Sequence, residues 1–114
     1  MNNILKTIIG LFFIFSIYIL SIEAQEKMNW YGARDYCEEK GMRLPTVAEL
    51  KEMYENECSG NKYEEVRCAK LYWSSEDYAP DTTCAMDVGF SRGCVDDDDK
   101  SAAYDYVRCV RAGP

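Results

Sequence analysis

The stretch from residue 30 to residue 50 limits the possible folds of this chain more than any other part. It predicts a first helix over residues 29–40, because Trp30 and Cys37 recur at a helical spacing and lie on one face. Gly41 follows, and a glycine just after a helix often adopts the left-handed conformation that ends it. One cysteine therefore lies on the inward face of an early helix.

A second helix is predicted directly after a short Arg-Leu-Pro connection. Pro45 keeps that connection extended. Thr46 is followed three residues later by Glu49, and this spacing predicts a capping box at the start of the helix. Leu50 and Tyr54 then form its apolar stripe. The sequence thus predicts two early helices joined by a short turn.

The C-terminal stretch over residues 104–111 predicts a strand, with Val107 and Cys109 on one face. A disulfide from Cys37 to Cys109 would join the first helix to this last strand. The chain has six cysteines, and an even count in a small secreted chain implies disulfides, although many pairings are open. The preferred set pairs Cys37 with Cys109, Cys84 with Cys94 across a hairpin, and Cys58 with Cys68 within a surface loop.

Residues 1–24 are predicted to be a secretory signal peptide. Lys6 supplies a positive charge, residues 8–20 are almost entirely apolar, and Ala24 precedes the predicted cleavage. The alternative is an uncleaved anchor, but the apolar run is shorter than the roughly 20 residues that a spanning helix needs. Cleavage would leave residues 25–114, which are 114 − 24 = 90 residues and form a single domain. Disulfides would help to stabilise a domain this small.

Several short antiparallel strands are expected after the two helices. Residues 71–73 form an aromatic strand, and residues 83–90 alternate so that Val88 and Asp87 lie on opposite faces. Residues 96–99 are four consecutive aspartates, whose mutual repulsion predicts a charged loop. Two helices followed by short strands indicate the α+β class.

Four motifs in a fixed order resemble a bacterial C-type-lectin-like domain, the family typified by the C-terminal domain of the Legionella collagen-like adhesin. The likeness covers residues 28–111. Residues 72–75 resemble the central strand of that family, and residues 107–111 resemble its closing strand. The remaining motifs consist of Trp30, Ala33, Tyr36, Cys37, Gly41, Arg43, Leu44, Pro45, Thr46, Glu49 and Leu50.

The resemblance implies a C-type-lectin-like fold and a binding role. It also implies the Cys37–Cys109 and Cys84–Cys94 bridges, because the wider fold has a long-range bridge and an inner one. The chain departs from calcium-dependent lectins, since it has no Glu-Pro-Asn, Gln-Pro-Asp or Trp-Asn-Asp triplet. Those groups would ligate calcium and sugar hydroxyls together, so calcium-dependent sugar binding is not expected.

No enzymatic activity is predicted. The chain has no histidine, which removes the usual general base, the Ser-His-Asp and Cys-His arrangements and histidine metal sites. It has no Cys-x-x-Cys pair, which disfavours zinc ribbons and thioredoxin-like redox chemistry. A relative of the formylglycine-generating enzymes, which share the broad fold, is the enzymatic alternative, but this chain is too short for their additional active-site elements.

Two loops, over residues 75–81 and 91–103, are the expected ligand-binding surface. Binding residues concentrate on loops held by a rigid scaffold, and tyrosine suits stacking against a sugar or a protein. Trp30 and Trp73 are instead expected in the core. The candidate ligand-binding residues are Tyr78, Asp81, Arg92, Asp96, Asp97, Asp98, Asp99 and Tyr104.

The domain is acidic. The net charge is −7, and it stays at −7 without residues 1–24 because Lys6 and Glu23 cancel. An acidic domain repels nucleic acid and anionic membrane surfaces, so neither is an expected partner. No cofactor or metal site is predicted. Calcium at residues 96–99 is the alternative, because hard cations prefer several oxygen ligands, but consecutive side chains diverge.

These observations predict a secreted, periplasmic or cell-surface binding module that recognises a glycan or a protein surface, as in adhesion. The alternative is a small disulfide-stabilised structural or inhibitory protein with no glycan site. After cleavage of the signal peptide, no stable membrane insertion is expected.

Overall fold

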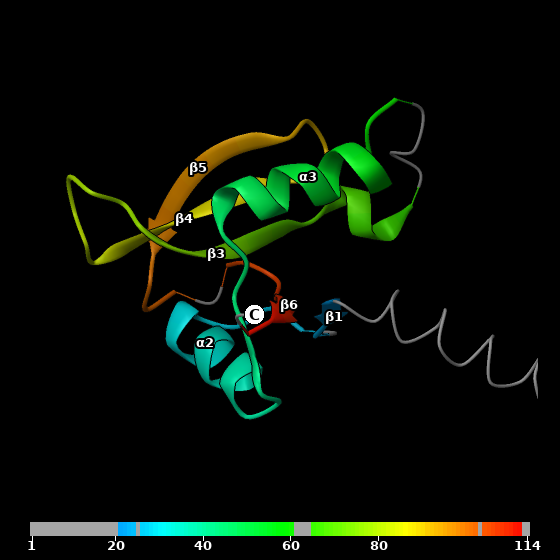
Figure 1. Ribbon diagram of the computed structural model, residues 1–114. Coiled ribbons are helices and arrows are strands. Elements are labelled where there is room, and N and C mark those ends of the chain that lie inside the picture. The colour runs from blue at the N-terminus through cyan, green and yellow to red at the C-terminus, as the bar shows by residue number, and fades with distance from the viewer. Residues whose placement is uncertain (1–20, 25, 61–64, 103, 113–114) are drawn as a thin grey trace, which may run out of the picture.

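The computed structural model describes residues 21–24, 26–60, 65–102 and 104–112 (Figure 1). Its helices and its two three-stranded sheets form the predicted α+β fold. One sheet has the strand order β1-β6-β2 and the other the order β3-β4-β5. The elements are β1 (Ser21–Glu23), α2 (Trp30–Glu38), β2 (Met42–Arg43), α3 (Val47–Glu57), the 3-10 helix η1 (Val66–Ala69), β3 (Leu71–Asp77), β4 (Cys84–Gly89), β5 (Cys94–Asp99) and β6 (Arg108–Arg111).

Both helices lie where the sequence predicts them, and local interactions fix their starts. The side chain of Asn29 caps α2 by accepting a hydrogen bond from the backbone N–H of Gly32. Gly41, shortly after α2, has a φ of 68°, the left-handed conformation that glycine adopts without strain. Thr46 and Glu49 form the predicted capping box of α3, with both reciprocal hydrogen bonds present. These interactions join residues close in sequence, which is why sequence patterns reveal them.

The sheet β3-β4-β5 has a hydrophobic cluster on each face. On one face, α3 lies along the sheet (Figure 1), and Leu50 packs in one cluster with Val88 and Phe90. On the other face, Trp73 and Ala85 belong to a cluster that includes residues of α2 and β6. The predicted alternation along β4 is confirmed, because Ala85 and Val88 belong to different clusters. The sheet therefore forms the middle layer of the domain.

Two of the three predicted disulfides are present. Cys37 of α2 is bonded to Cys109 of β6, across 72 positions of sequence. Cys58 is bonded to Cys68, across 10 positions. The long-range bridge joins the first helix to the last strand, as the sequence predicts.

The predicted Cys84–Cys94 bridge is wrong, because both cysteines are free. In the antiparallel pair β4-β5, Cys84 lies opposite Asp99, whereas Cys94 lies opposite Gly89, five positions further along β4. At a rise of about 3.4 Å per residue the two cysteines are about 17 Å apart. A disulfide needs Cα atoms within about 7 Å, so this register excludes the bond.

The four consecutive aspartates at residues 96–99 belong to strand β5, so the predicted charged loop is wrong. Each of them lies opposite a residue of β4, from Asp87 to Cys84. Side chains alternate between the two faces of a strand, so neighbouring aspartates point apart and repel one another less than in a compact loop. The backbone groups of this run form hydrogen bonds with β4, and this pairing holds the four aspartates in a strand.

Residues 21–24, which the sequence places at the end of a signal peptide, pack into the domain. Strand β1 pairs with β6, with Ile22 opposite Cys109, and Ala24 is buried. Cleavage after Ala24 stays a prediction, and it would remove this strand from the sheet. In the described part of the chain, no helix combines the length and apolar character that crossing a membrane requires.

Candidate functional site

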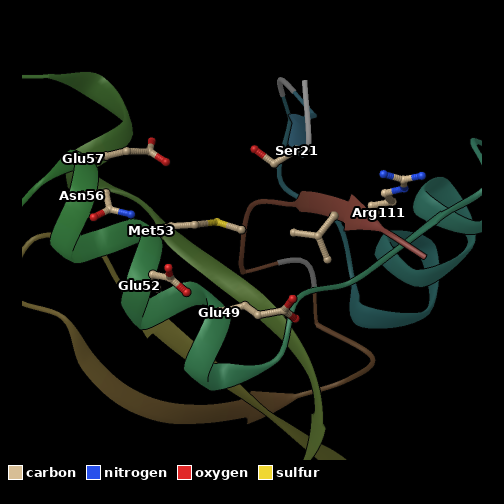
Figure 2. Close-up of a pocket in the computed structure, with 8 residues that line it drawn as sticks. Ser21, Glu49, Glu52, Met53, Asn56, Glu57 and Arg111 are labelled. Carbon is tan, nitrogen blue, oxygen red and sulfur yellow. The ribbon is translucent and has the colours of Figure 1, made fainter. Parts of the chain in front are cut away.

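A groove of about 450 Å³ runs between α3 and the strands β1 and β6 (Figure 2). Met53 of α3 and Val110 of β6 are the apolar side chains that line it. Its charged rim comes mostly from α3, whose side chains face Ser21 and Arg111 across the opening in Figure 2. The acidic residues of that rim are Glu49, Glu52 and Glu57.

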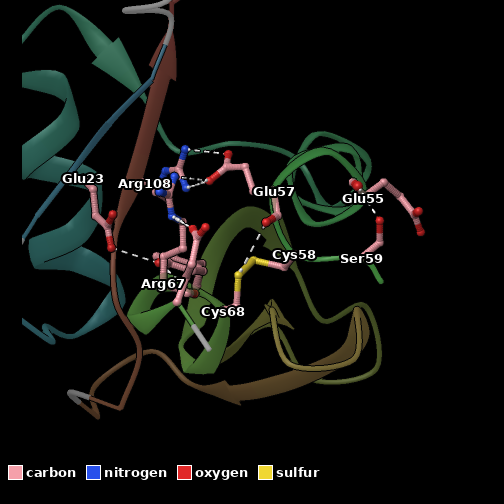
Figure 3. Close-up of a disulfide and its surroundings, with 10 residues drawn as sticks. Glu23, Glu55, Glu57, Cys58, Ser59, Arg67, Cys68 and Arg108 are labelled. Carbon is pink, nitrogen blue, oxygen red and sulfur yellow. Dashed lines mark hydrogen bonds and ion pairs between the residues drawn. A yellow bond between two sulfur atoms is a disulfide. The ribbon is translucent and has the colours of Figure 1, made fainter. Parts of the chain in front are cut away.

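Glu57 is held at one end of the groove by arginines (Figure 3). Its two carboxylate oxygens each accept a hydrogen bond of 3.0 Å from the guanidinium of Arg108, which also donates to Ser21 Oγ at 2.9 Å. Arg67 donates a further bond to Glu57 at 3.3 Å. Burial alone would raise the pKa of Glu57, but the two arginines outweigh it and lower that pKa. Glu57 therefore fixes the junction of α3, β6 and β1.

Glu49 is held at the other end. Arg43 donates two parallel hydrogen bonds to its carboxylate, Nη1 to Oε1 at 2.7 Å and Nη2 to Oε2 at 3.0 Å. The backbone N–H of Thr46 donates a third bond, at 2.9 Å. The hydrogen bonds from Arg43, together with its charge and those from Thr46, outweigh the effect of burial and lower the pKa of Glu49 to about 2.

The low pKa of Glu49 predicts a loss of stability in acid. Because its folded-state pKa lies below the ordinary value of 4.5, its contribution is fully present above about pH 4.5 and is lost as the pH falls towards 2. The pair is partly exposed, so we expect the contribution to be at most about 1 kcal/mol. Urea unfolding of Glu49→Gln should show a smaller decrease in stability between pH 5 and pH 2 than the unmodified protein. An equal decrease in both proteins would contradict this assignment.

Glu52 is the carboxylate of the groove that is left for a ligand. It is exposed, and it makes no hydrogen bond or ion pair with another residue that the structure describes. Arg111 on the opposite side is also exposed and makes no ion pair within the described residues. The groove thus combines an apolar base with one negative and one positive group that are free to bind. The sequence pattern places Glu49 and Glu52 on the solvent face of α3 but does not indicate that β1 and β6 lie opposite.

Three of the predicted ligand-binding residues gather at one end of the sheet β3-β4-β5. Tyr78 is half-buried, and its backbone N–H donates to the carbonyl of Cys84. Asp81 accepts two hydrogen bonds from Thr83, which lower its pKa. Asp99 lies opposite Cys84 and accepts two hydrogen bonds from Ser101. This end of the sheet therefore carries one tyrosine and two of the predicted aspartates.

The other predicted residues are not brought to that end. Arg92 lies at the opposite end of β5 and lines, with Asp96, a hollow of about 340 Å³. Tyr104 is 62% exposed and immediately precedes Asp105. The structure therefore distributes the predicted set over at least two separate surfaces.

Asp98 lies in a third place, together with two residues that the sequence-based prediction misses. Its carboxylate oxygen lies within 4.8 Å of oxygens from Asp87 of β4 and Asp105, which precedes β6. Asp87 and Asp105 are 0% and 1% exposed. Burial, followed by interactions among the acidic groups, raises the pKa of Asp87, and burial is also the main cause of the raised pKa of Asp105. The alternation of β4 places Asp87 on one face, but only the fold shows that this face is covered.

Comparison with known proteins agrees with the architecture. A C-type lectin, TC14 from the tunicate Polyandrocarpa misakiensis, matches the structure with a TM-score of 0.57 and 17% sequence identity. The match covers 82% of this chain and 98% of the lectin, and it shows a shared fold. No curated protein matches the chain. The sequence matches the Lcl C-terminal domain family over residues 14–111, so the chain belongs to that family and has a C-type-lectin-like fold.

Proposed function

We propose that this protein is a secreted or surface-exposed binding module, without catalytic activity, that attaches to a glycan or a protein ligand. Membership of an adhesin-type family with a lectin-like fold supports a binding role. Lectin-like domains bind through surface features carried by a rigid scaffold. Here the scaffold is the sheet β3-β4-β5, with one disulfide joining α2 to β6 and another joining the end of α3 to η1.

The observation that carries the proposal is the groove between α3 and the strands β1 and β6. Its volume of about 450 Å³ falls within the range of about 300–1,000 Å³ that is usual for ligand pockets. Met53 and Val110 offer apolar contact, while Glu52 and Arg111 offer unengaged charged groups. A few placed polar groups around an apolar base are typical of sites that orient a ligand.

The charge of the protein limits the ligand. With a net charge of −7, the domain repels polyanions, so heavily sulfated or phosphorylated ligands are disfavoured. A neutral or amino-bearing glycan, or a basic protein segment, would instead find in the groove the carboxylate of Glu52, which is unpaired among the described residues.

The proposal is tested by screening the protein on a glycan array and in pull-downs of surface proteins, followed by affinity measurements on variants. We expect Glu52→Lys to weaken binding of the captured ligand at least tenfold, because it reverses the one acidic group of the groove without a partner among the described residues. A tenfold loss corresponds to about 1.4 kcal/mol, close to the lower end of the range of about 1.5–3 kcal/mol for a hydrogen bond to a charged group.

Glu55→Lys is the matched control. Glu55 lies on the same helix, is exposed and does not line the groove, so the same change of charge there should leave binding intact. Equal loss in both variants would show a long-range charge effect and contradict the groove. Tyr78→Ala tests the sequence-based placement at the end of the sheet in the same assay. If the screens return no ligand, the alternative of a structural or inhibitory protein is favoured.

A further inference from the structure

Three aspartates from separate parts of the chain converge between the sheet β3-β4-β5 and the segment that leads into β6. One carboxylate oxygen of each of Asp87, Asp98 and Asp105 lies within 4.8 Å of the other two. Asp87 lies on the central strand β4 and Asp98 on the neighbouring strand β5. The backbone of Asp105 accepts a hydrogen bond of 3.1 Å from Met28. The three carboxylates thus come from two neighbouring strands of the sheet and from the segment that leads into β6.

The register of β4 and β5 explains why Asp98 joins this group. Asp98 lies opposite Ala85, and Asp96 lies opposite Asp87. Residues directly opposite in an antiparallel pair share a face, so Asp98 and Asp87 are diagonal neighbours on the same face. Ala85 carries only a methyl group, which leaves room above it for the carboxylate of Asp98. Asp97 points to the other face.

No cation among the described residues forms an ion pair with this group. All four side-chain oxygens of Asp87 and Asp105 are buried and have no hydrogen-bond partner among the described residues. Lys100, the nearest lysine in sequence, donates instead to Asp77 at 2.6 Å. The charge of Lys27 acts on Asp105 only as a minor influence, and its ammonium lies over the ring of Tyr106. Buried polar groups are normally paired, so unpaired carboxylates require an explanation.

We infer that Asp87, Asp98 and Asp105 form a binding site for a hard divalent cation, with calcium as the expected ion. Calcium binds oxygen ligands at about 2.3–2.6 Å, so two ligands of one ion lie at most about 5 Å apart, which fits the spacing of these oxygens. The chain has no histidine, and three carboxylates select hard cations over zinc or copper. Asp98 is half-buried, which leaves the site access to solvent and to water ligands.

This site differs from calcium at the four consecutive aspartates of β5. It uses one member of that run and two residues outside it. Alternation directs Asp97 and Asp99 to the other face, while the side chain of Asp96, on the same face, accepts a hydrogen bond from the backbone N–H of Asp97. It is also independent of the groove and of the proposed glycan or protein binding. Sharing of a proton between Asp87 and Asp105 is the competing explanation, and it requires no metal.

Calcium binding is tested on the purified protein after treatment with EDTA, by isothermal titration calorimetry and thermal unfolding. We expect saturable binding with a Kd on the order of 0.1–1 mM, as in extracellular calcium modules. At about 10 mM calcium we expect Tm to rise by about 6–20 °C, the lower figure for the weaker Kd. Absence of both the heat of binding and the rise in Tm, with calcium, magnesium and manganese alike, would overturn the inference in favour of a shared proton.

Isosteric variants assign the ligands. Asp98→Asn and Asp105→Asn should each weaken calcium binding at least tenfold, while Tm in EDTA should stay the same or rise because a repelling charge is removed. The unchanged Tm shows that the variants remain folded. Asp97→Asn, with the same change of charge on the other face of β5, should retain the affinity. Equal weakening by Asp97→Asn would assign calcium to the run of four aspartates and refute the site proposed here.

Discussion

Replacing Cys37 and Cys109 together by alanine is expected to lower the free energy of unfolding by about 4 kcal/mol. The bridge closes a loop of 72 positions, and the entropy that such a loop removes from the unfolded chain gives an estimate of this size. Both cysteines are 0% exposed in the cluster that contains Trp73, so the bridge also joins α2 to β6 inside the core. Urea unfolding, measured at a single pH and temperature, gives the difference directly.

Cys94→Ser is the control for this measurement. Cys94 is exposed and free, so its replacement should change the free energy of unfolding by less than about 0.5 kcal/mol. A comparable loss of stability in Cys94→Ser would indicate that Cys94 is bonded to Cys84 and would contradict the register of β4 and β5. Peptide mapping without reductant should likewise find only the Cys37–Cys109 and Cys58–Cys68 bridges.

The second large effect is expected from removing β1. A protein that begins at Gln25 should be less stable than one that begins at Ser21 by about 3 kcal/mol or more, because hydrogen bonds to buried partners and apolar contacts are lost together. The hydroxyl of Tyr72 would lose its bond of 2.9 Å to Glu23, and Arg108 would lose its bond to Ser21. Chemical unfolding of the two proteins provides the comparison.

A single substitution separates the polar contribution of β1 from its strand pairing. In the longer protein, Glu23→Gln removes the charge that acts on Tyr72 and Lys70 but retains the strand. We expect this substitution to lower the free energy of unfolding by less than half as much as the truncation does. Burial of Tyr72, together with its bond to Glu23, raises the pKa of its hydroxyl, so ultraviolet titration of tyrosine should show earlier ionisation in the truncated protein. Equal stability of the two lengths would show that β1 is dispensable.

This prediction bears on the processing of the chain. The signal-peptide pattern places the cleavage after Ala24, whereas β1 contributes Ser21, Ile22 and Glu23 to the folded domain. The mass and N-terminal sequence of the exported protein would decide which residues remain. A first residue at or before Ser21 would retain the strand and the contribution of Ser21 to the groove, and cleavage after Ala24 would remove both.

The helices and their ends follow from interactions between residues a few positions apart. The capping box joins Thr46 to Glu49, and the side chain of Asn29 reaches the N–H of Gly32. Such contacts require no knowledge of the rest of the fold. The Cys37–Cys109 bridge was also predictable, because the two cysteines lie within an early helix and a late strand that carry recognisable family motifs.

The pairing of the strands was not predictable from local patterns. A run of four aspartates has a low strand propensity, and only its pairing with β4 makes residues 96–99 a strand. The same register separates Cys84 from Cys94, which was the one disulfide placed wrongly. The groove and the three converging aspartates arise in the same way, from elements that are distant in sequence.

The sequence by itself predicted the α+β class, the two helices, the family and two of the disulfides that the structure contains. Only the tertiary structure decided the register of β5, the addition of β1 to the sheet and the burial of Asp87 beside Asp98 and Asp105. The physical reason is the range of the interactions. Helix caps depend on neighbours in the chain, whereas strand pairing and the burial of a charge depend on which distant segments come to lie beside them.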